Sequence, residues 1–320
     1  MRSDCRRRAQ PLALVLLTAA TALVGVAAQP SAAQAAPRCF GAAAIDRKRP
    51  CMNRTRTVTP KPDKVAGVHE AYCAPIRRQR DPDVCTFGTR AARAVADIAL
   101  IGDSHAVHWR TPLDLVARVM RWHGFSVTAP GCFFGHAVFA MPTGLLEPCA
   151  PWYRSVVRWL AEHPEISTVV VSQNAPTPVR LNPGETEHGV KAAGYARTWR
   201  ALPRNVKRVI VIRDTPRLPA TTFDCVRRVI AAGTARARTA CSYSRRRALI
   251  ADPAMSAVAR LRSARYRAVD MTDFFCGSRR CYPVIGGVLV HRDSDHINGV
   301  YAKTLGPYLL RAIRRIVRRP

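Results

Sequence analysis

The sequence predicts an α/β protein in which helices cover both faces of a parallel sheet. Short apolar runs that end in turn residues alternate with longer segments whose apolar residues recur at helical spacing. The chain has 320 residues and is 48% apolar, which is too much for a disordered protein. We therefore expect a three-layer α/β/α sandwich with one large core.

The predicted strands are short and apolar, as buried parallel strands usually are. The first covers residues 96–101 and leads directly into Gly102-Asp103-Ser104. Ligand sites in such sheets lie at the carboxyl ends of the strands, which draws attention to this loop. The other predicted elements are strands at 125–128, 168–172, 209–212 and 266–269, and helices at 112–122, 152–160, 247–261 and from Asn298 onward.

The first 35 residues have the pattern of a secretory signal peptide. Four arginines within the first eight residues precede an uncharged run from Pro11 to Ala28, and Ala33-Gln34-Ala35 supplies a cleavage site. The apolar run is nearly long enough to cross a bilayer, so a single uncleaved N-terminal anchor stays open as an alternative. We expect the protein to be secreted or held in the cell envelope.

Ten of the eleven cysteines lie beyond the predicted signal peptide. An even number in an exported chain indicates disulfides, and short loops favour the pairs Cys132–Cys149, Cys225–Cys241 and Cys276–Cys281. The cysteines lack the spacing with histidines that zinc sites require, so we expect no metal. Residues 36–92 hold four cysteines and show little periodicity, and we interpret them as an irregular, disulfide-linked extension that packs on a main domain at 93–320.

The chain is strongly basic, with a formal net charge of +30. Loss of residues 1–35 removes four arginines and Asp4, which leaves +27. A basic surface attracts polyanions, yet the arginines are spread along the chain without the motifs of nucleic-acid-binding domains. We therefore expect no nucleic acid partner, and an envelope glycan, wall polymer or anionic lipid surface as the polyanion. The arginines of the last helix are interpreted as a solvated face.

Ser104 and His296 are the candidate catalytic pair. Ser104 follows the first predicted strand, where Gly102 permits a tight turn. A serine hydroxyl becomes a good nucleophile when a base removes its proton, and His296 would be that base. Asp293 lies three residues before His296, so one turn can hold its carboxylate against the imidazole. Each motif alone is weak, because Asp-x-x-His is often a cap or a surface turn.

Taken together, Ile101-Gly102-Asp103-Ser104-His105 and Asp293-x-x-His296 resemble the motifs of the SGNH (GDSL-type) hydrolase superfamily. More narrowly, the chain is similar to the SGNH domains attached to membrane acyltransferase-3 proteins that O-acetylate bacterial surface glycans. Cys132 with Cys149, and the segments at 274–276, 281–283 and 291–293, also resemble that group. The resemblance runs from about residue 95 to the C-terminus. It implies a three-layer α/β/α fold and ester chemistry that needs no metal or cofactor.

The resemblance also implies an oxyanion hole. In the superfamily, a glycine and an asparagine join the serine's own amide in stabilising the developing negative charge. Gly131, after the second predicted strand, and Asn174, after the third, occupy matching places. The family usually has glycine two residues before the asparagine, where this chain has Ser172. A simple turn at Gly131 and a loop start at Asn174 are the alternative interpretations.

Three neighbouring residues have simpler interpretations. Asp103 is expected to brace the loop by accepting backbone hydrogen bonds. His105 either shapes the pocket or is a buried structural imidazole. Asp214, at the end of the fourth predicted strand, is expected to support the site without touching the substrate.

We expect a secreted serine esterase or O-acyltransferase that acts on acetyl esters of envelope glycans through an acyl-Ser104 intermediate. The substrate would be an acylated envelope polysaccharide or a small ester, and a membrane acyltransferase is a candidate partner. The sequence does not decide between water and a sugar hydroxyl as the acceptor. One alternative is a non-catalytic glycan-binding or assembly protein on the same scaffold. Another is a basic polyanion-binding envelope protein.

Overall fold

The computed structural model of the chain describes residues 39–51, 53, 55–67, 70–76, 82–137, 149–233 and 236–318. These residues belong to one compact unit. The predicted signal peptide at residues 1–35 lies outside the described residues. Within the described ranges, no helix is both long enough and apolar enough to cross a membrane.

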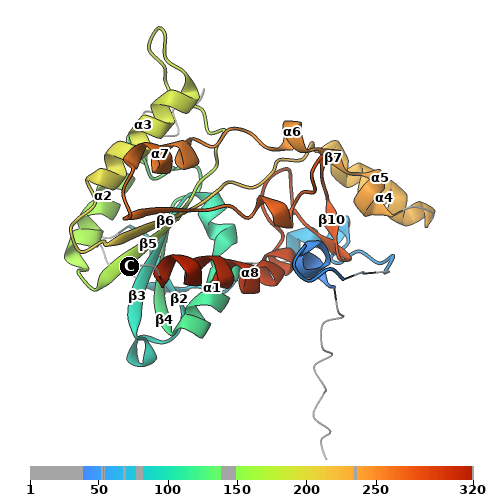
Figure 1. Ribbon diagram of the computed structural model, residues 1–320, viewed down its shortest axis with the longest axis horizontal. Coiled ribbons are helices and arrows are strands. Elements are labelled where there is room, and N and C mark those ends of the chain that lie inside the picture. Colours follow the sequence, from blue (N-terminus) through green and yellow to red (C-terminus); the bar gives the residue numbers. More distant parts are fainter. Residues whose placement is uncertain are drawn as a thin grey trace, which may run out of the picture. The chain divides into compact units, whose positions relative to one another are not determined.

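A seven-stranded sheet forms the centre of this unit (Figure 1). Its strand order is β1-β2-β4-β3-β5-β6-β8, and the five strands from β4 to β8 run parallel. Strand β2 is antiparallel to both of its neighbours. The strands are β1 Ala74–Ile76, β2 Val84–Gly88, β3 Ala96–Gly102, β4 Trp122–Thr128, β5 Ile166–Ser172, β6 Arg208–Ile212 and β8 Tyr266–Val269.

Alternate residues of each central strand face opposite helical layers. In β3, Ile98 and Leu100 belong to the core on one side of the sheet, and Ala99 and Ile101 belong to the core on the other. The first side is covered by α1 (Ser104–Met120) and α8 (Gly299–Val317), and the second by α2 (Cys149–Glu162), α3 (Glu187–Arg200) and α7 (Pro253–Leu261) (Figure 1). This arrangement confirms the predicted three-layer α/β/α sandwich.

Smaller elements lie outside these layers. Strands β10 and β11 form a short hairpin, and β7 pairs with β9. Their bounds, with those of the short helices, are β7 Tyr243–Ser244, β9 Arg280–Cys281, β10 Val284–Ile285, β11 Val288–Leu289, α4 Thr221–Ala232, α5 Ala237–Ala240, α6 Arg245–Ala248, η1 Gly41–Ile45, η2 Pro62–Gly67, η3 Ala91–Arg93 and η4 Thr272–Phe274.

Two helices differ from their predicted bounds for local reasons. Helix α1 begins at Ser104 and not at residue 112, because the Asp103 carboxylate caps it by accepting a hydrogen bond from the His105 amide. His105 and His108 are buried in its first turns. Because histidine is not an apolar residue, a search for apolar residues at helical spacing overlooks these turns. The helix predicted at 247–261 is broken into α6 and α7, because Pro253 starts a new helix that the Asp252 side chain caps.

The segment read as an irregular extension contributes regular structure. Strands β1 and β2 add two strands to the sheet beside β4. Residue Thr59 pairs with Val288 of β11 in a single bridge. The described residues include five disulfides, of which the last three are the pairs expected from the sequence: Cys39–Cys51, Cys73–Cys85, Cys132–Cys149, Cys225–Cys241 and Cys276–Cys281.

Gly102, at the end of β3, is required by the close approach of β5. It has a φ of +151°, and a Cβ at this position would lie 2.0 Å from the carbonyl oxygen of Ser172. No side chain fits such a contact with the backbone, so the strand must end in glycine before it turns into Ser104.

We predict that Gly102→Ala lowers the free energy of unfolding by about 3 kcal/mol or more, because strain and a backbone clash add together. Gly184→Ala is the matched control, since Gly184 also has a positive φ (+81°) but open space around its Cβ position. The control should cost about 1 kcal/mol. Urea unfolding of the oxidised proteins measures both changes, and equal losses would contradict this role of Gly102.

Candidate active site

The candidate catalytic residues gather at the carboxyl edge of the parallel sheet. Ser104 is the first residue of α1, directly beyond β3. The loop after β4 is tied to this point by a 3.1 Å hydrogen bond from the Ala129 amide to the Gly102 carbonyl. The loop after β5 is tied to it by a 2.9 Å bond from the Asn174 amide to the Asp103 carboxylate. The Asp103 carboxylate accepts the amides of His105 and Asn174, so it joins its own turn to the loop after β5, in agreement with the expected bracing role.

Ser104 and His296 meet although 192 residues separate them in the chain. The Ser104 Oγ lies 2.8 Å from Nε2 of His296. On the other side of the imidazole, Nδ1 lies 2.8 Å from Oδ2 of Asp293, whose Oδ1 accepts the His296 backbone amide at 2.7 Å. The structure thus brings the three predicted residues into one hydrogen-bonded chain.

A second carboxylate also contacts the imidazole. Oδ1 of Asp295 lies 3.2 Å from Nδ1 of His296, and the Asp295 side chain is only 8% exposed, against 46% for Asp293. Partial burial alone would lower the pKa of His296, but hydrogen bonds and charge from the two aspartates outweigh it and raise this pKa to about 9. Hydrogen bonds from His296 and nearby backbone amides lower the pKa of Asp293, although burial opposes the change.

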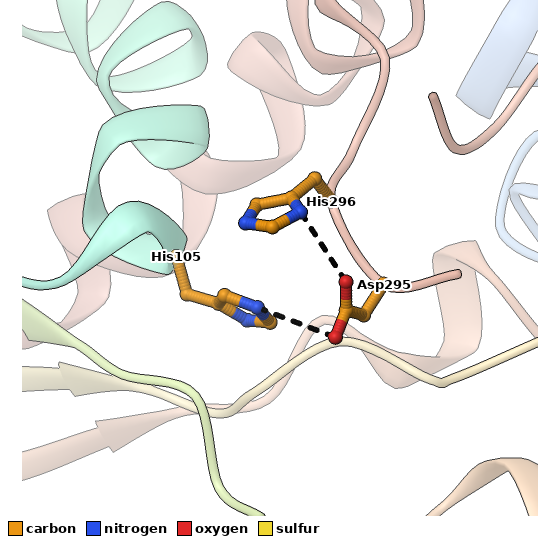
Figure 2. A group of neighbouring side chains, drawn as sticks. All are labelled: His105, Asp295 and His296. Atoms are coloured by element: carbon orange, nitrogen blue, oxygen red, sulfur yellow. Dashed lines mark ion pairs between the residues drawn. The ribbon is translucent and has the colours of Figure 1, made fainter. Parts of the chain in front are cut away.

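Asp295 links the imidazole to two further side chains, Arg217 and His105. Its Oδ2 forms an ion pair with Arg217. The same oxygen lies 3.9 Å from Nε2 of His105 (Figure 2). His105 is fully buried, and its Nδ1 lies 2.5 Å from Oδ1 of Asp214. Burial would lower the pKa of His105, but the Asp214 charge raises it. Asp214 also accepts the Ala175 amide at 2.8 Å, so it supports the site from behind.

His105, Asp295 and His296 offer donor atoms that lie within 4.8 Å of one another, as a metal site would (Figure 2). Their other contacts favour a network of ion pairs instead. The guanidinium of Arg217 already pairs with Asp295, and a divalent cation at this point would be repelled by it. The donor set therefore fits a network of hydrogen bonds and ion pairs among these side chains better than a bound metal.

Comparison with known proteins identifies the family. Residues 71–311, more than half of the chain, match the family model described as "SGNH domain (fused to AT3 domains)". The chain belongs to this family. The resemblance expected from the Ser104 and His296 motifs is thereby confirmed.

The SGNH domain is also similar to solved structures. The periplasmic domain of a Salmonella ser. Paratyphi A lipopolysaccharide acetyltransferase has a TM-score of 0.53 and 10% identity, over 71% of this chain and 90% of that chain. A Corynascus thermopiles (Myceliophthora fergusii) carbohydrate esterase family 2 enzyme with a carbohydrate binding domain has a TM-score of 0.40 and 14% identity, over 71% and 68%. The likeness to the Salmonella domain supports the fold alone. None of the curated proteins searched matches the chain.

The residues expected to form an oxyanion hole lie in the two loops that are hydrogen-bonded to Gly102 and Asp103. Gly131 is exposed in the turn after β4 with a φ of +81°. Asn174 follows β5 and is half-buried, and its Oδ1 accepts a 3.0 Å hydrogen bond from Arg217. Arg217 therefore holds the Asn174 amide and the Asp295 carboxylate together.

Sequence patterns did not assign a role to Asp295 or Arg217. Asp295 lies inside the Asp-x-x-His motif. It was given no role because Asp293, three residues before His296, has the spacing that the family uses for its catalytic aspartate. Arg217 lies in the loop after β6, and its place beyond the carboxyl end of a strand is the one signal that could have singled it out. Asp214, which precedes it by three residues, carried the same signal.

We predict that Asp295→Asn lowers the pKa of the His296 imidazole below about 9, because one of its two carboxylates is lost. The folded-state pKa of His296 lies above its ordinary value of 6.5. Protonation of His296 therefore adds to the free energy of unfolding, fully below pH 6.5, and this contribution is lost as the pH rises through about 9. NMR titration of the imidazole measures the shift. Asp224→Asn, which breaks an exposed pair with Arg227, is the control and should leave it unchanged. An unchanged pKa in Asp295→Asn would contradict the role of this carboxylate.

Proposed function

We propose that this SGNH domain is a serine esterase or O-acyltransferase that acts on acetyl esters of cell-envelope glycans. The observation that supports it most is the 2.8 Å contact between Ser104 Oγ and His296 Nε2. A serine hydroxyl at hydrogen-bonding distance from an imidazole, with that imidazole held by a carboxylate, is the arrangement that acyl-transfer enzymes share.

In the proposed reaction, Ser104 Oγ attacks the carbonyl carbon of the ester, and His296 Nε2 takes the hydroxyl proton. The tetrahedral intermediate then collapses, the alcohol leaves with the proton from His296, and an acyl-Ser104 ester remains. A water molecule or a sugar hydroxyl next attacks this ester and gives its proton to His296. Collapse of the second intermediate releases acetate or the new ester and returns the proton to Ser104.

We assign stabilisation of the oxyanion to the amides of Ser104 and Gly131 and to the side chain of Asn174. The bond from Arg217 occupies Oδ1 of Asn174, which leaves the donor atom Nδ2 of the same amide for the developing negative charge. Asp293 orients His296 and stabilises the imidazolium formed during attack. Because the pKa of His296 is about 9, the basic form of the imidazole becomes more abundant as the pH rises toward that value.

Several observations support an envelope glycan as the substrate. The family model describes SGNH domains fused to AT3 domains, and the similar Salmonella structure is a periplasmic domain of a lipopolysaccharide acetyltransferase. The five disulfides fit an oxidising compartment outside the cytoplasm. We therefore propose an extracytoplasmic location behind a signal peptide at residues 1–35, and a membrane acyltransferase as a candidate donor of acyl groups.

We predict that a fluorophosphonate labels the wild-type protein at Ser104, and that Ser104→Ala abolishes the label. Incubation with an aryl acetate should give an acetyl adduct in the intact mass, and turnover should fall by about 10⁴-fold or more in Ser104→Ala.

Ser256→Ala is the matched control for this labelling. Ser256 Oγ lies 2.9 Å from Nε2 of His188, but no carboxylate among the described residues is bonded to that imidazole. The control should keep both the label and the turnover. Absence of a label on folded wild-type protein would favour the non-catalytic glycan-binding scaffold.

We predict that Asn174→Ala lowers kcat by about 10²-fold with little change in KM, because an oxyanion donor acts mainly in the transition state. Asn182→Ala, in the exposed loop before α3, is the control and should leave kcat unchanged. Steady-state kinetics with an aryl acetate measures both variants. A rise in KM at constant kcat would instead indicate a role in binding the substrate.

A further inference from the structure

A cavity of about 360 Å³ lies away from the sheet, between the N-terminal segment, helices α4 and α5, and the hairpin of β10 and β11. Cys51, which is bonded to Cys39, lines the cavity, and the Cys225–Cys241 disulfide joins α4 to the residue that follows α5. A small separate core that includes Val58, Val226, Val284 and Leu289 lies beneath this region. The walls of the cavity are therefore built from distant segments that are fixed to one another.

The rim of the cavity is stabilised by hydrogen bonds between the N-terminal segment and the hairpin. Nδ2 of Asn53 donates to the carbonyl oxygens of Cys39 at 3.2 Å and Gly286 at 2.8 Å. The amide of Thr59 donates to the Gly287 carbonyl at 2.9 Å. These contacts keep the opening in place without a ligand.

The charge of the cavity is positive. Arg56, Arg236 and Arg238 line it, and the described lining includes no aspartate or glutamate. None of the three arginines forms an ion pair within the described part of the chain. The guanidinium of Arg238 lies 4.4 Å from the centre of the Tyr282 ring, which holds it in place. Three guanidinium groups that lack a counterion among the described residues can together bind carboxylate or phosphate oxygens.

The rest of the lining suits a carbohydrate. The hydroxyls of Thr55 and Thr57 lie 2.7 Å apart, and Thr239 adds a third hydroxyl on the opposite wall. Val229, Ile230 and Val284 supply apolar surface. Hydroxyl groups for hydrogen bonds, apolar surface for the faces of sugar rings, and fixed cations for acidic substituents together match a charged glycan segment.

The cavity is connected to the catalytic loop through the hairpin. Gly286 and Gly287 line it, and β11 follows them directly. The chain then reaches Asp293 within four residues of the end of β11, and the bridge between His291 and Ile297 closes the base of the catalytic loop. A chain held in the cavity is thus bound by the same hairpin that leads to His296.

A second basic cavity, of about 410 Å³, offers a comparison. Arg204, Arg208 and Arg267 line it near the amino ends of β6 and β8, at the edge of the sheet opposite the carboxyl ends where Ser104 lies. Its described lining has cations and aliphatic groups but no hydroxyl or amide side chain. This second cavity is basic like the first. Its described lining lacks the hydroxyl groups that suit a carbohydrate, and the hairpin that leads to the catalytic loop does not contribute to it.

We propose that the cavity lined by Arg56, Arg236 and Arg238 binds an acidic segment of the glycan chain, carrying carboxylate or phosphate groups, while an acetyl ester on that chain reaches Ser104. The choice of a glycan as carrier of the negative charge rests on the proposed function. The binding itself does not, because it needs no ester chemistry.

The test measures binding by isothermal titration calorimetry in a Ser104→Ala background. The probes are an oligogalacturonate, which carries carboxylates, an oligo(glycerol phosphate), and a neutral cello-oligosaccharide. We expect at least one acidic probe to bind and the neutral one not to, and the acidic probe that binds identifies the preferred group. Replacement of Arg56, Arg236 and Arg238 by glutamine should weaken this binding at least about tenfold and reduce the salt slope by about 2, since each phosphate contact of a single strand contributes about 0.7.

Arg204, Arg208 and Arg267 replaced together by glutamine form the matched control, because this variant loses the same charge. It should keep the binding. If the triple variant does not fold, replacement of Arg56 and Arg236 alone by glutamine tests the same site. This double variant keeps the contact of Arg238 with Tyr282 and should still lose part of the affinity. Equal loss in the control, no binding of either acidic probe, or single-stranded DNA as the tighter ligand of the same arginines would overturn the proposal. Binding of an acidic probe by a protein that has no esterase activity would support this proposal and contradict the proposed function. Esterase activity without binding of either acidic probe would do the reverse.

Discussion

The contact between Ser104 and His296 depends on one packing constraint, the side-by-side arrangement of α1 and α8 on the same face of the sheet (Figure 1). Ser104 is the first residue of α1, and His296 lies three residues before α8 begins. Buried residues of both helices, such as Leu113 and Leu305, belong to one core. Because the two helices start at the same edge of the sheet, residues 192 positions apart reach hydrogen-bonding distance. Burial of this helix pair therefore fixes the geometry of the candidate site.

Electrostatics then set the properties of the imidazole. Two carboxylates share Nδ1 of His296, one half-exposed and in the family's position, the other nearly buried and paired with Arg217. The pair makes the imidazolium more stable and the imidazole a stronger base. In the proposed mechanism, the same pair also makes the basic form less abundant at neutral pH. Arg217 forms an ion pair with Asp295 and donates a hydrogen bond to Asn174, so it connects this carboxylate to the loop after β5.

The sequence predicted the parts of the fold that depend on local apolar pattern. The runs at 96–101, 168–172 and 209–212 are strands because each is apolar on both faces, and the structure places all three at the centre of the sheet. Strand β2 was missed because Thr86 and Gly88 break its apolar pattern. The start of α1 was missed because its buried positions include histidines. The site followed partly from motif spacing, but Arg217 depends on loop geometry that no periodicity encodes.

In the proposed mechanism, Ser104 is the nucleophile, His296 is its base, and an oxyanion hole that includes Asn174 faces the reacting carbonyl. A crystal structure of the protein after reaction with a fluorophosphonate tests it most directly. The account predicts a covalent bond between phosphorus and Ser104 Oγ, His296 Nε2 within about 3 Å of that oxygen, and the phosphonyl oxygen within hydrogen-bonding distance of Asn174 Nδ2. A phosphonyl group on another residue, or one on Ser104 whose oxygen points away from Asn174, would contradict it.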